Sequence, residues 1–184
     1  MSVYETLRRL ILPLDEIDVA VPNSGTIIEL GCGQGVIATY LSKKSTRKVI
    51  GFDYNSERLP KTKKKNLSFK KADITNVSLP NTDCYILSDV LHHLNTEEQK
   101  AILIKIYKAL EKKGTLIIKE IDTEELIRSN LSRLWDFILY PKDKISFLNS
   151  INLEKNLKKL GFQVTITRPC RFFPGSTTLF VCRK

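Results

Sequence analysis

The segment Thr26–Ile37, TIIELGCGQGVI, constrains the fold of this chain more than any other stretch. An apolar, β-branched run reaches Glu29, glycines follow at alternate positions 31, 33 and 35, and apolar residues then recur at helical spacing. This pattern predicts a buried strand, a tight turn and the start of a helix. Glycine in such a turn reaches positive φ without strain and lets a ligand approach the backbone. We therefore expect a ligand at this turn, although a purely structural glycine turn would show the same pattern.

Two ligand classes use a glycine-rich turn between a strand and a helix. Dinucleotide folds have G-x-G-x-x-G, with the pyrophosphate at the helix N-terminus and an acid about 20 residues later for the ribose. This chain has G-x-G-x-G, with Val36 after the last glycine and Glu29 two residues before the first. A carboxylate there would repel pyrophosphate but suits a ligand that carries an ammonium group. The spacing therefore disfavours an oxidoreductase that binds NAD(P).

The sequence ELGCGQG resembles motif I of the class I methyltransferases that use S-adenosylmethionine (SAM). The resemblance runs from Thr26 to Lys184 and implies a three-layer α/β/α sandwich with a mostly parallel, seven-stranded sheet in the order 3-2-1-4-5-7-6, strand 7 being antiparallel. SAM is the implied cofactor, and S-adenosylhomocysteine (SAH) the product. The implied cofactor contacts in motif I are Glu29, Gly31, Cys32, Gly33 and Gly35.

Two aspartates follow later predicted strands. Asp53 closes the short apolar strand Lys48–Tyr54, where one carboxylate can accept both hydroxyl protons of a ribose. In the resemblance this is motif II, and Tyr54 lies against the adenine. After the predicted strand 67–71, the family has an acid that bonds the adenine amine, which implies cofactor contacts at Ala72, Asp73 and Ile74. A helix-capping Asp53 and an Asx-turn Asp73 are the structural alternatives.

The stretch 83–94, DCYILSDVLHHL, carries the two histidines of the chain side by side. It resembles motif IV of methyltransferases that act on small molecules and lipids, which implies that Ser88 and Asp89 lie beside the methionine part of SAM and that a histidine faces the acceptor. Because adjacent side chains cannot both point inward, one of His92 and His93 is expected to be catalytic and the other to pack. A hydrogen-bonded structural pair is the alternative, and no ligand spacing predicts a metal site.

Charged residues end the next predicted strand, Thr115–Ile121. Charges at the carboxyl end of a central parallel strand are costly unless they face the ligand cleft or one another. We expect Lys119 and Asp122 to contact the acceptor and Glu120 to act as a general base. An ion pair of Lys119 with Glu120 or Asp122 explains the same residues equally well.

The remaining pattern predicts one domain over residues 1–184. Residues 1–22 are expected to form a helical cap, and 123–150 an acceptor pocket or lid that includes Trp135 and Tyr140. The best-defined helix is 95–110, with a capping box of Asn95 and Glu98 and with Gly114 just past its end. A helix at 152–160 and strands at 162–167 and 177–182 complete the fold.

The formal net charge of +10 is carried largely by Lys43–Lys48 and Lys61–Lys71. Both segments are expected at helix ends and surface loops, so a solvated basic surface is preferred to a nucleic-acid site. The motifs of exocyclic amino-group and cytosine C5 methylation are missing, which also disfavours nucleic-acid bases as acceptors. RNA nevertheless stays an alternative partner.

These features favour a SAM-dependent methyltransferase that acts on an oxygen or nitrogen atom of a small, partly apolar molecule or lipid. The alternatives are an RNA or protein methyltransferase that uses the basic surface, and a non-catalytic SAM-binding partner subunit. The absence of a signal peptide, of a long apolar run and of paired C-x-x-C cysteines predicts a cytoplasmic protein with reduced thiols and no transmembrane segment. The oligomeric state is left open.

Overall fold

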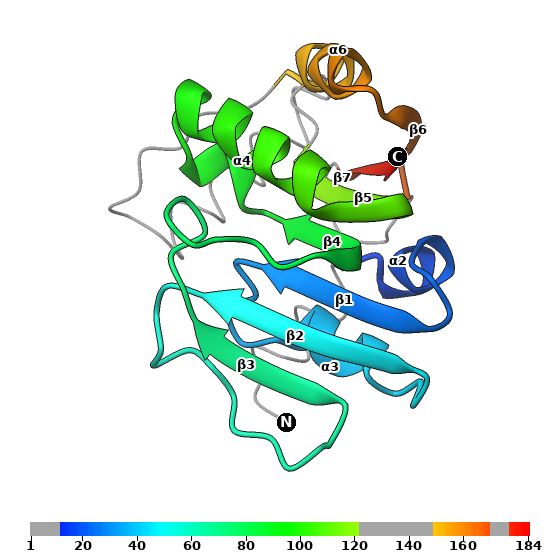
Figure 1. Ribbon diagram of the computed structural model, residues 1–184. Coiled ribbons are helices and arrows are strands. Elements are labelled where there is room, and N and C mark those ends of the chain that lie inside the picture. The colour runs from blue at the N-terminus through cyan, green and yellow to red at the C-terminus, as the bar shows by residue number, and fades with distance from the viewer. Residues whose placement is uncertain (1–11, 122–148, 170–176) are drawn as a thin grey trace.

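The computed structural model describes residues 12–121, 149–169 and 177–184, and its centre is a seven-stranded sheet (Figure 1). The strand order is β3-β2-β1-β4-β5-β7-β6. Strand β7 is antiparallel to both of its neighbours, and the strands from β1 to β5 are parallel. The predicted fold class and strand order are therefore confirmed. The strands are β1 (Gly25–Leu30), β2 (Arg47–Asp53), β3 (Leu67–Lys71), β4 (Thr82–Ser88), β5 (Leu110–Ile121), β6 (Gln163–Thr167) and β7 (Thr177–Arg183).

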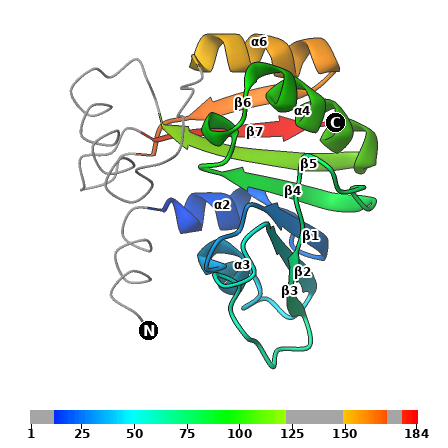
Figure 2. The same cartoon turned by 90° about the vertical axis from the view of Figure 1, so that its left-hand side faces the viewer.

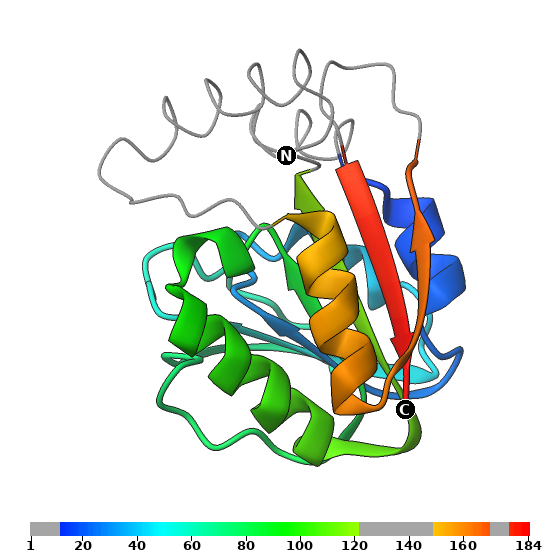
Figure 3. The same ribbon diagram turned by 90° about the horizontal axis from the view of Figure 1, so that it is seen from above.

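Helices cover both faces of the sheet, as Figures 2 and 3 show. Successive strand residues point to opposite faces, so Ile27 packs with the side chains of α2 (Leu14–Ala20) and α3 (Val36–Leu41). Its neighbour Ile28 belongs to the core on the other face, which α4 (Thr96–Ala109) and α6 (Ser150–Leu160) cover. The two cores give three layers. Within the described ranges, no helix has the length and apolar character that a membrane span requires.

The start of α4 confirms the predicted capping box, but the end of the helix differs from the prediction. The Asn95 side chain accepts from Glu97 N and Glu98 N, and Glu98 Oε2 accepts from Asn95 N at 2.9 Å. The helix ends at Ala109, and β5 begins at Leu110 instead of at position 115. Gly114 is therefore not the helix cap. An added Cβ at Gly114 would lie 2.9 Å from the Glu111 carbonyl oxygen, so the glycine permits a close backbone contact inside the strand.

Helix α6 begins two residues earlier than predicted. It starts at Ser150 because Asn149 Oδ1 accepts from Ile151 N (2.9 Å) and Asn152 N (3.3 Å). Its end is as predicted, with Gly161 at φ 105° just after Leu160. Asparagine tolerates both cap and interior positions, and Asn152, the predicted first residue, lies inside the first turn of the helix.

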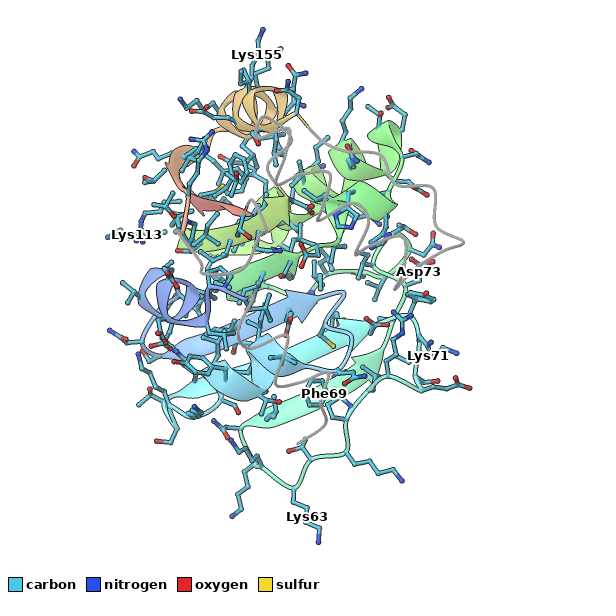
Figure 4. All side chains as sticks on the ribbon, turned by 180° about the vertical axis from the view of Figure 1, so that it is seen from behind. Lys63, Phe69, Lys71, Asp73, Lys113 and Lys155 are labelled. Atoms are coloured by element: carbon cyan, nitrogen blue, oxygen red, sulfur yellow. The ribbon has the colours of Figure 1, made fainter. Side chains whose placement is uncertain are left out.

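Arg47 is the exception to the predicted solvated basic surface. It belongs to the basic segment 43–48, yet its side chain is fully buried. Its Nε donates to Pro22 O at 2.7 Å, its Nη2 to Asp18 O at 3.0 Å and its Nη1 to the Asp18 carboxylate. The guanidinium group thus joins α2 to the start of β2. Other basic side chains do point away from the body of the protein, as Figure 4 shows for Lys63, Lys113 and Lys155.

Candidate functional site

The predicted site residues meet where the parallel strands end. In Figure 1 the arrowheads of β1, β2 and β3 point the same way, and the glycine turn follows β1 at that edge. Carboxyl ends of parallel strands form the ligand cleft in open α/β sheets. Two groups of side chains can be followed there: one around the glycine turn and Asp53, and one around the ends of β4 and β5.

The three glycines of the turn all have positive φ, at 72°, 51° and 65° for Gly31, Gly33 and Gly35. An added Cβ on Gly31 would lie 2.5 Å from Val90 Cγ2, and one on Gly35 would overlap the ring of Phe69. At Gly33 an added Cβ would meet nothing within 4 Å. The expectation that a ligand needs the glycines therefore applies to Gly33, whereas the other two make room for the protein's own side chains.

Phe69, labelled in Figure 4, lies over a second glycine as well. A Cβ on Gly51 of β2 would lie 2.6 Å from Phe69 Cδ1 and 2.7 Å from Cys32 Sγ. The ring therefore packs between strand β2 and the turn. The Cys32 thiol is buried, and burial, followed by the charges of Glu29 and Asp53, raises its pKa far above the usual range. Cys32 is thus a buried free cysteine, and its implied contact with the cofactor stays a prediction.

Asp53 joins the glycine turn to the end of β2. It is 4% exposed, its Oδ2 accepts from Gly33 N at 2.7 Å, and its Oδ1 accepts from Asn55 N at 2.9 Å. A carboxylate offers about four lone-pair positions. Two amide bonds leave acceptor capacity for further hydroxyl groups. Tyr54, which follows Asp53, is 64% exposed.

Glu29 accepts a hydrogen bond from helix α3 that the sequence did not predict. It is 3% exposed, and its Oε2 accepts from Ala38 N at 2.8 Å. Helix α3 begins after Gly35, which has no side chain to cap it, so Glu29 supplies the acceptor from β1. A contact between Glu29 and a ligand ammonium group stays a prediction.

Asp73 forms an Asx turn, which was the structural alternative for this residue. Its Oδ1 accepts from Thr75 N (2.9 Å) and Thr75 Oγ1 (2.7 Å), and its Oδ2 accepts from Asn76 Nδ2 (2.7 Å). These bonds, the one from the Thr75 side chain first, lower the pKa of Asp73 below its usual value. Ala72 lies beside Asp53, to whose carbonyl its N–H donates at 2.9 Å. The adenine contacts of Ala72, Asp73 and Ile74 stay predictions.

Glu120 organises the segment that follows β4. It is 5% exposed, and its Oε1 accepts from Leu91 N at 2.8 Å and Val90 N at 3.2 Å. Its Oε2 lies 2.7 Å from His92 Nδ1. These contacts hold the short 3-10 helix η1 (Leu91–His93) and the ring of His92. Three contacts with the chain thus occupy most of the about four lone-pair positions of the Glu120 carboxylate, and its predicted role as a general base stays a prediction.

Among the described residues Lys119 pairs with Asp89, and not with Glu120 as one form of the ion-pair alternative supposed, while Asp122 lies outside the described residues. Its Nζ lies 2.5 Å from Asp89 Oδ1, and the two side chains are 4% and 14% exposed. Asp89 also donates its backbone N–H to Lys119 O at 2.9 Å and has φ 56°, a conformation uncommon for residues other than glycine. Sequence spacing did not indicate this pair, because thirty positions separate its members.

The two histidines occupy different environments. His92 is 2% exposed and is bonded to Glu120, whereas His93 is half-buried. Their ring centroids are 4.2 Å apart, with 46° between the ring planes. The ring of His92 is thus bonded to Glu120, and the prediction that one histidine faces the acceptor stays a prediction.

A hydroxyl group and a possible ligand set complete this part of the site. Ser88 is 7% exposed, and its Oγ has no hydrogen-bond partner among the described residues.

One donor atom each from Asp89, His92 and Glu120 lie within 4.8 Å of one another, close enough to hold a metal ion. The prediction of no metal site rested on spacing along the chain, which cannot detect donors from two separate segments. The predicted site residues Asp122, Trp135 and Tyr140 lie outside the described residues.

Comparisons with known proteins identify a family for this chain. A family model described as a methyltransferase domain matches residues 4–166. O-methyltransferase 12 of Dictyostelium discoideum is 29% identical over 107 residues, which are 54% of this chain and 29% of that protein. Carboxy-S-adenosyl-L-methionine synthase of Mannheimia succiniciproducens is 27% identical over 113 residues, 54% of this chain and 46% of that protein. The matches thus span less than half of either relative.

A solved structure has the same fold. Magnesium protoporphyrin IX methyltransferase from Synechocystis PCC 6803, with bound SAH, superposes with a TM-score of 0.71 at 17% identity. The match covers 93% of this chain and 81% of that one.

Proposed function

This chain belongs to the methyltransferase domain family, and we propose that it binds SAM and transfers the methyl group to an oxygen or nitrogen atom of a small, partly apolar molecule or lipid. The observation that carries the proposal is the turn after β1, where Gly33 faces open space and its N–H is held by Asp53. The similarity to an O-methyltransferase supports an oxygen acceptor.

The residues at the strand ends fit SAM. Asp53 has acceptor capacity left for a ribose diol, and the exposed ring of Tyr54 follows it, available to an adenine. The buried Ser88 Oγ, which lacks a partner among the described residues, would gain one from the methionine part. We assign Asp89 and Glu29 to the methionine part of SAM as well. The adenine is assigned to Ala72, Asp73 and Ile74. Here SAM supplies an electrophilic methyl group and a sulfur that leaves as a neutral thioether.

The chain's own contribution is mainly to orient the acceptor. Holding two reactants in line can supply roughly 7–11 kcal/mol of the barrier. A strong base is therefore optional, although an acceptor hydroxyl or ammonium must still lose its proton. We assign the acceptor pocket to residues 123–150, with Trp135, Tyr140 and Asp122, because aromatic residues are frequent there. Lys119, also expected at the acceptor, already has Asp89 as its partner.

We assign the removal of that proton to His92. A carboxylate has no hydrogen to donate, so the 2.7 Å contact with Glu120 Oε2 assigns the ring hydrogen to Nδ1. With the hydrogen on Nδ1, the ring lone pair lies on Nε2, and we assign Nε2 as the proton acceptor. In this arrangement His92 is the general base, and Glu120, which the sequence suggested for that role, is a positioning residue.

Calorimetry and methyl transfer test the proposal together. The protein is titrated with SAM, SAH and NADH, and is then incubated with methyl-labelled SAM and a cell extract that is fractionated into lipid, RNA, protein and small molecules. We expect binding of SAM and SAH but not NADH, and label in the lipid or small-molecule fraction. Label in RNA or protein would favour the alternative that uses the basic surface. Binding of SAM without transfer would favour a non-catalytic partner subunit.

The adjacent histidines provide a matched pair of variants. His92→Ala is expected to lower turnover more than SAM affinity, because the ring acts on the acceptor. His93→Ala is the control, since His93 makes a ring contact with His92 but has no described bond to Glu120. Equal turnover in both variants and in the wild type would make the pair structural.

A further inference from the structure

The cluster of Asp89, His92 and Glu120 has the composition of a metal site. Its three donor atoms lie within 4.8 Å of one another, and the side chains are 14%, 3% and 6% exposed. Two carboxylates and an imidazole are ligands that Zn²⁺ and similar divalent ions accept. Two carboxylates buried so close together also repel each other unless a positive charge is present.

A positive charge is already built into the chain. Lys119 Nζ lies 2.5 Å from Asp89 Oδ1, and the Lys119 side chain is 4% exposed. A buried ammonium group is expensive unless it is paired, and Lys119 precedes Glu120 in the same strand, so one strand end delivers both a cation and an anion to the cluster. A metal ion would have to compete with this ammonium group for Asp89.

We propose that Lys119 is the internal cation of this cluster and that it replaces a divalent metal ion there. Asp89 is bound by Lys119, and Glu120 is bound by Val90 N, Leu91 N and His92. Every member of the set thus has a partner from the chain itself. The consequence for catalysis, a metal-independent site, rests on the proposed function, but the affinity for metal can be measured without turnover.

Zinc titration of four proteins tests the proposal: the wild type, Lys119→Ala, Lys119→Arg and the double variant Lys119→Ala with Asp89→Asn. Removal of the ammonium group takes from the two carboxylates and the imidazole the cation that Lys119 provides. Lys119→Ala is therefore expected to bind one Zn²⁺ at least about tenfold more tightly than the wild type in calorimetry. The arginine variant, which keeps the charge, is expected to match the wild type, and the double variant to lose the gain.

Two results would overturn the proposal. One is a Lys119→Ala protein with no gain in Zn²⁺ affinity. The other is a wild-type protein that binds Zn²⁺ tightly and loses this binding in Asp89→Asn. The second comparison uses no Lys119 variant, so it decides the question even if Lys119→Ala does not fold. A wild-type protein that neither binds SAM nor transfers a methyl group would contradict the proposed function, and the zinc titrations would be unaffected by that result.

Discussion

Replacement of Asp53 by alanine separates the two tasks of this carboxylate. Asp53 accepts from Gly33 N at 2.7 Å and from Asn55 N at 2.9 Å, and a hydrogen bond to a charged group contributes about 1.5–3 kcal/mol. Loss of both bonds is expected to cost about 3 kcal/mol, the low end of their sum, because water can reach the amide of the open turn. Loss of the ribose contacts is expected to weaken SAM binding at least about tenfold, or about 1.4 kcal/mol.

A matched control lies at the opposite end of the sheet. Asp83 Oδ2 accepts from Thr26 N at 2.8 Å where β1 and β4 begin, far from the glycine turn. Asp83→Ala should therefore lower stability, measured by urea denaturation, without a change in SAM affinity, measured by calorimetry. Unchanged SAM affinity in Asp53→Ala would remove this residue from the ribose role. Equal weakening in both variants would show that loss of stability, and not loss of a contact, lowers the affinity.

Three further predictions concern Glu120, Arg47 and Asp18. Glu120→Gln presents an amide N–H₂ or a neutral oxygen to His92. Methyl transfer, measured in a labelled-methyl assay, is therefore expected to fall about 10²–10⁴-fold while SAM affinity changes little. Wild-type turnover in this variant would contradict the prediction. Arg47→Met removes one partner of a buried pair, and urea denaturation should show that the free energy of unfolding falls by about 3 kcal/mol. This is the low end of the usual range because Lys44 still binds Asp18 at 2.9 Å. A loss no larger than that of the exposed control Lys48→Met would refute the prediction. Burial raises the pKa of Asp18, but hydrogen bonds from Lys44 and Arg47 outweigh burial and lower it overall. The carboxylate therefore stabilises the fold above its unfolded-state pKa, and thermal denaturation should show this stability lost as the pH falls through the lowered folded-state pKa. Asp18→Asn should flatten that dependence, and an unchanged profile would exclude Asp18 as its source.

Local signals in the sequence were sufficient for most of the helices and strands, whereas the strand order came from the family resemblance. The change from an apolar run to alternate glycines at positions 31, 33 and 35 marks the first strand and helix, and the Asn95–Glu98 capping box marks the start of α4. Both signals act between residues a few positions apart, so a linear pattern contains them. The end of α4 was missed because Lys112 and Lys113 followed by glycine resembles a helix C-terminus, whereas pairing with β4 extends the strand back to Leu110.

Long-range contacts explain most of what the sequence could not show. Arg47 looked like part of a surface run, and its burial is tolerable because it bonds to Asp18, 29 positions earlier, and to the Pro22 carbonyl. The pairing of Lys119 with Asp89 and of Glu120 with His92 likewise joins the end of β5 to the segment after β4. The sequence named all four of these site residues, but it did not indicate which would touch.

The ring of Phe69 couples three positions that are far apart in the chain. It fills the space that a side chain on either Gly35 or Gly51 would need, and Gly35 begins the helix that follows the proposed SAM turn. A methyl group at either glycine becomes compatible with the fold only if residue 69 becomes smaller. Single substitutions in a mutational library should therefore fail at positions 35 and 51. Compensated substitutions that include position 69 should recover most readily at Gly51, where no positive φ adds strain, once the Cys32 thiol beside it has also shifted.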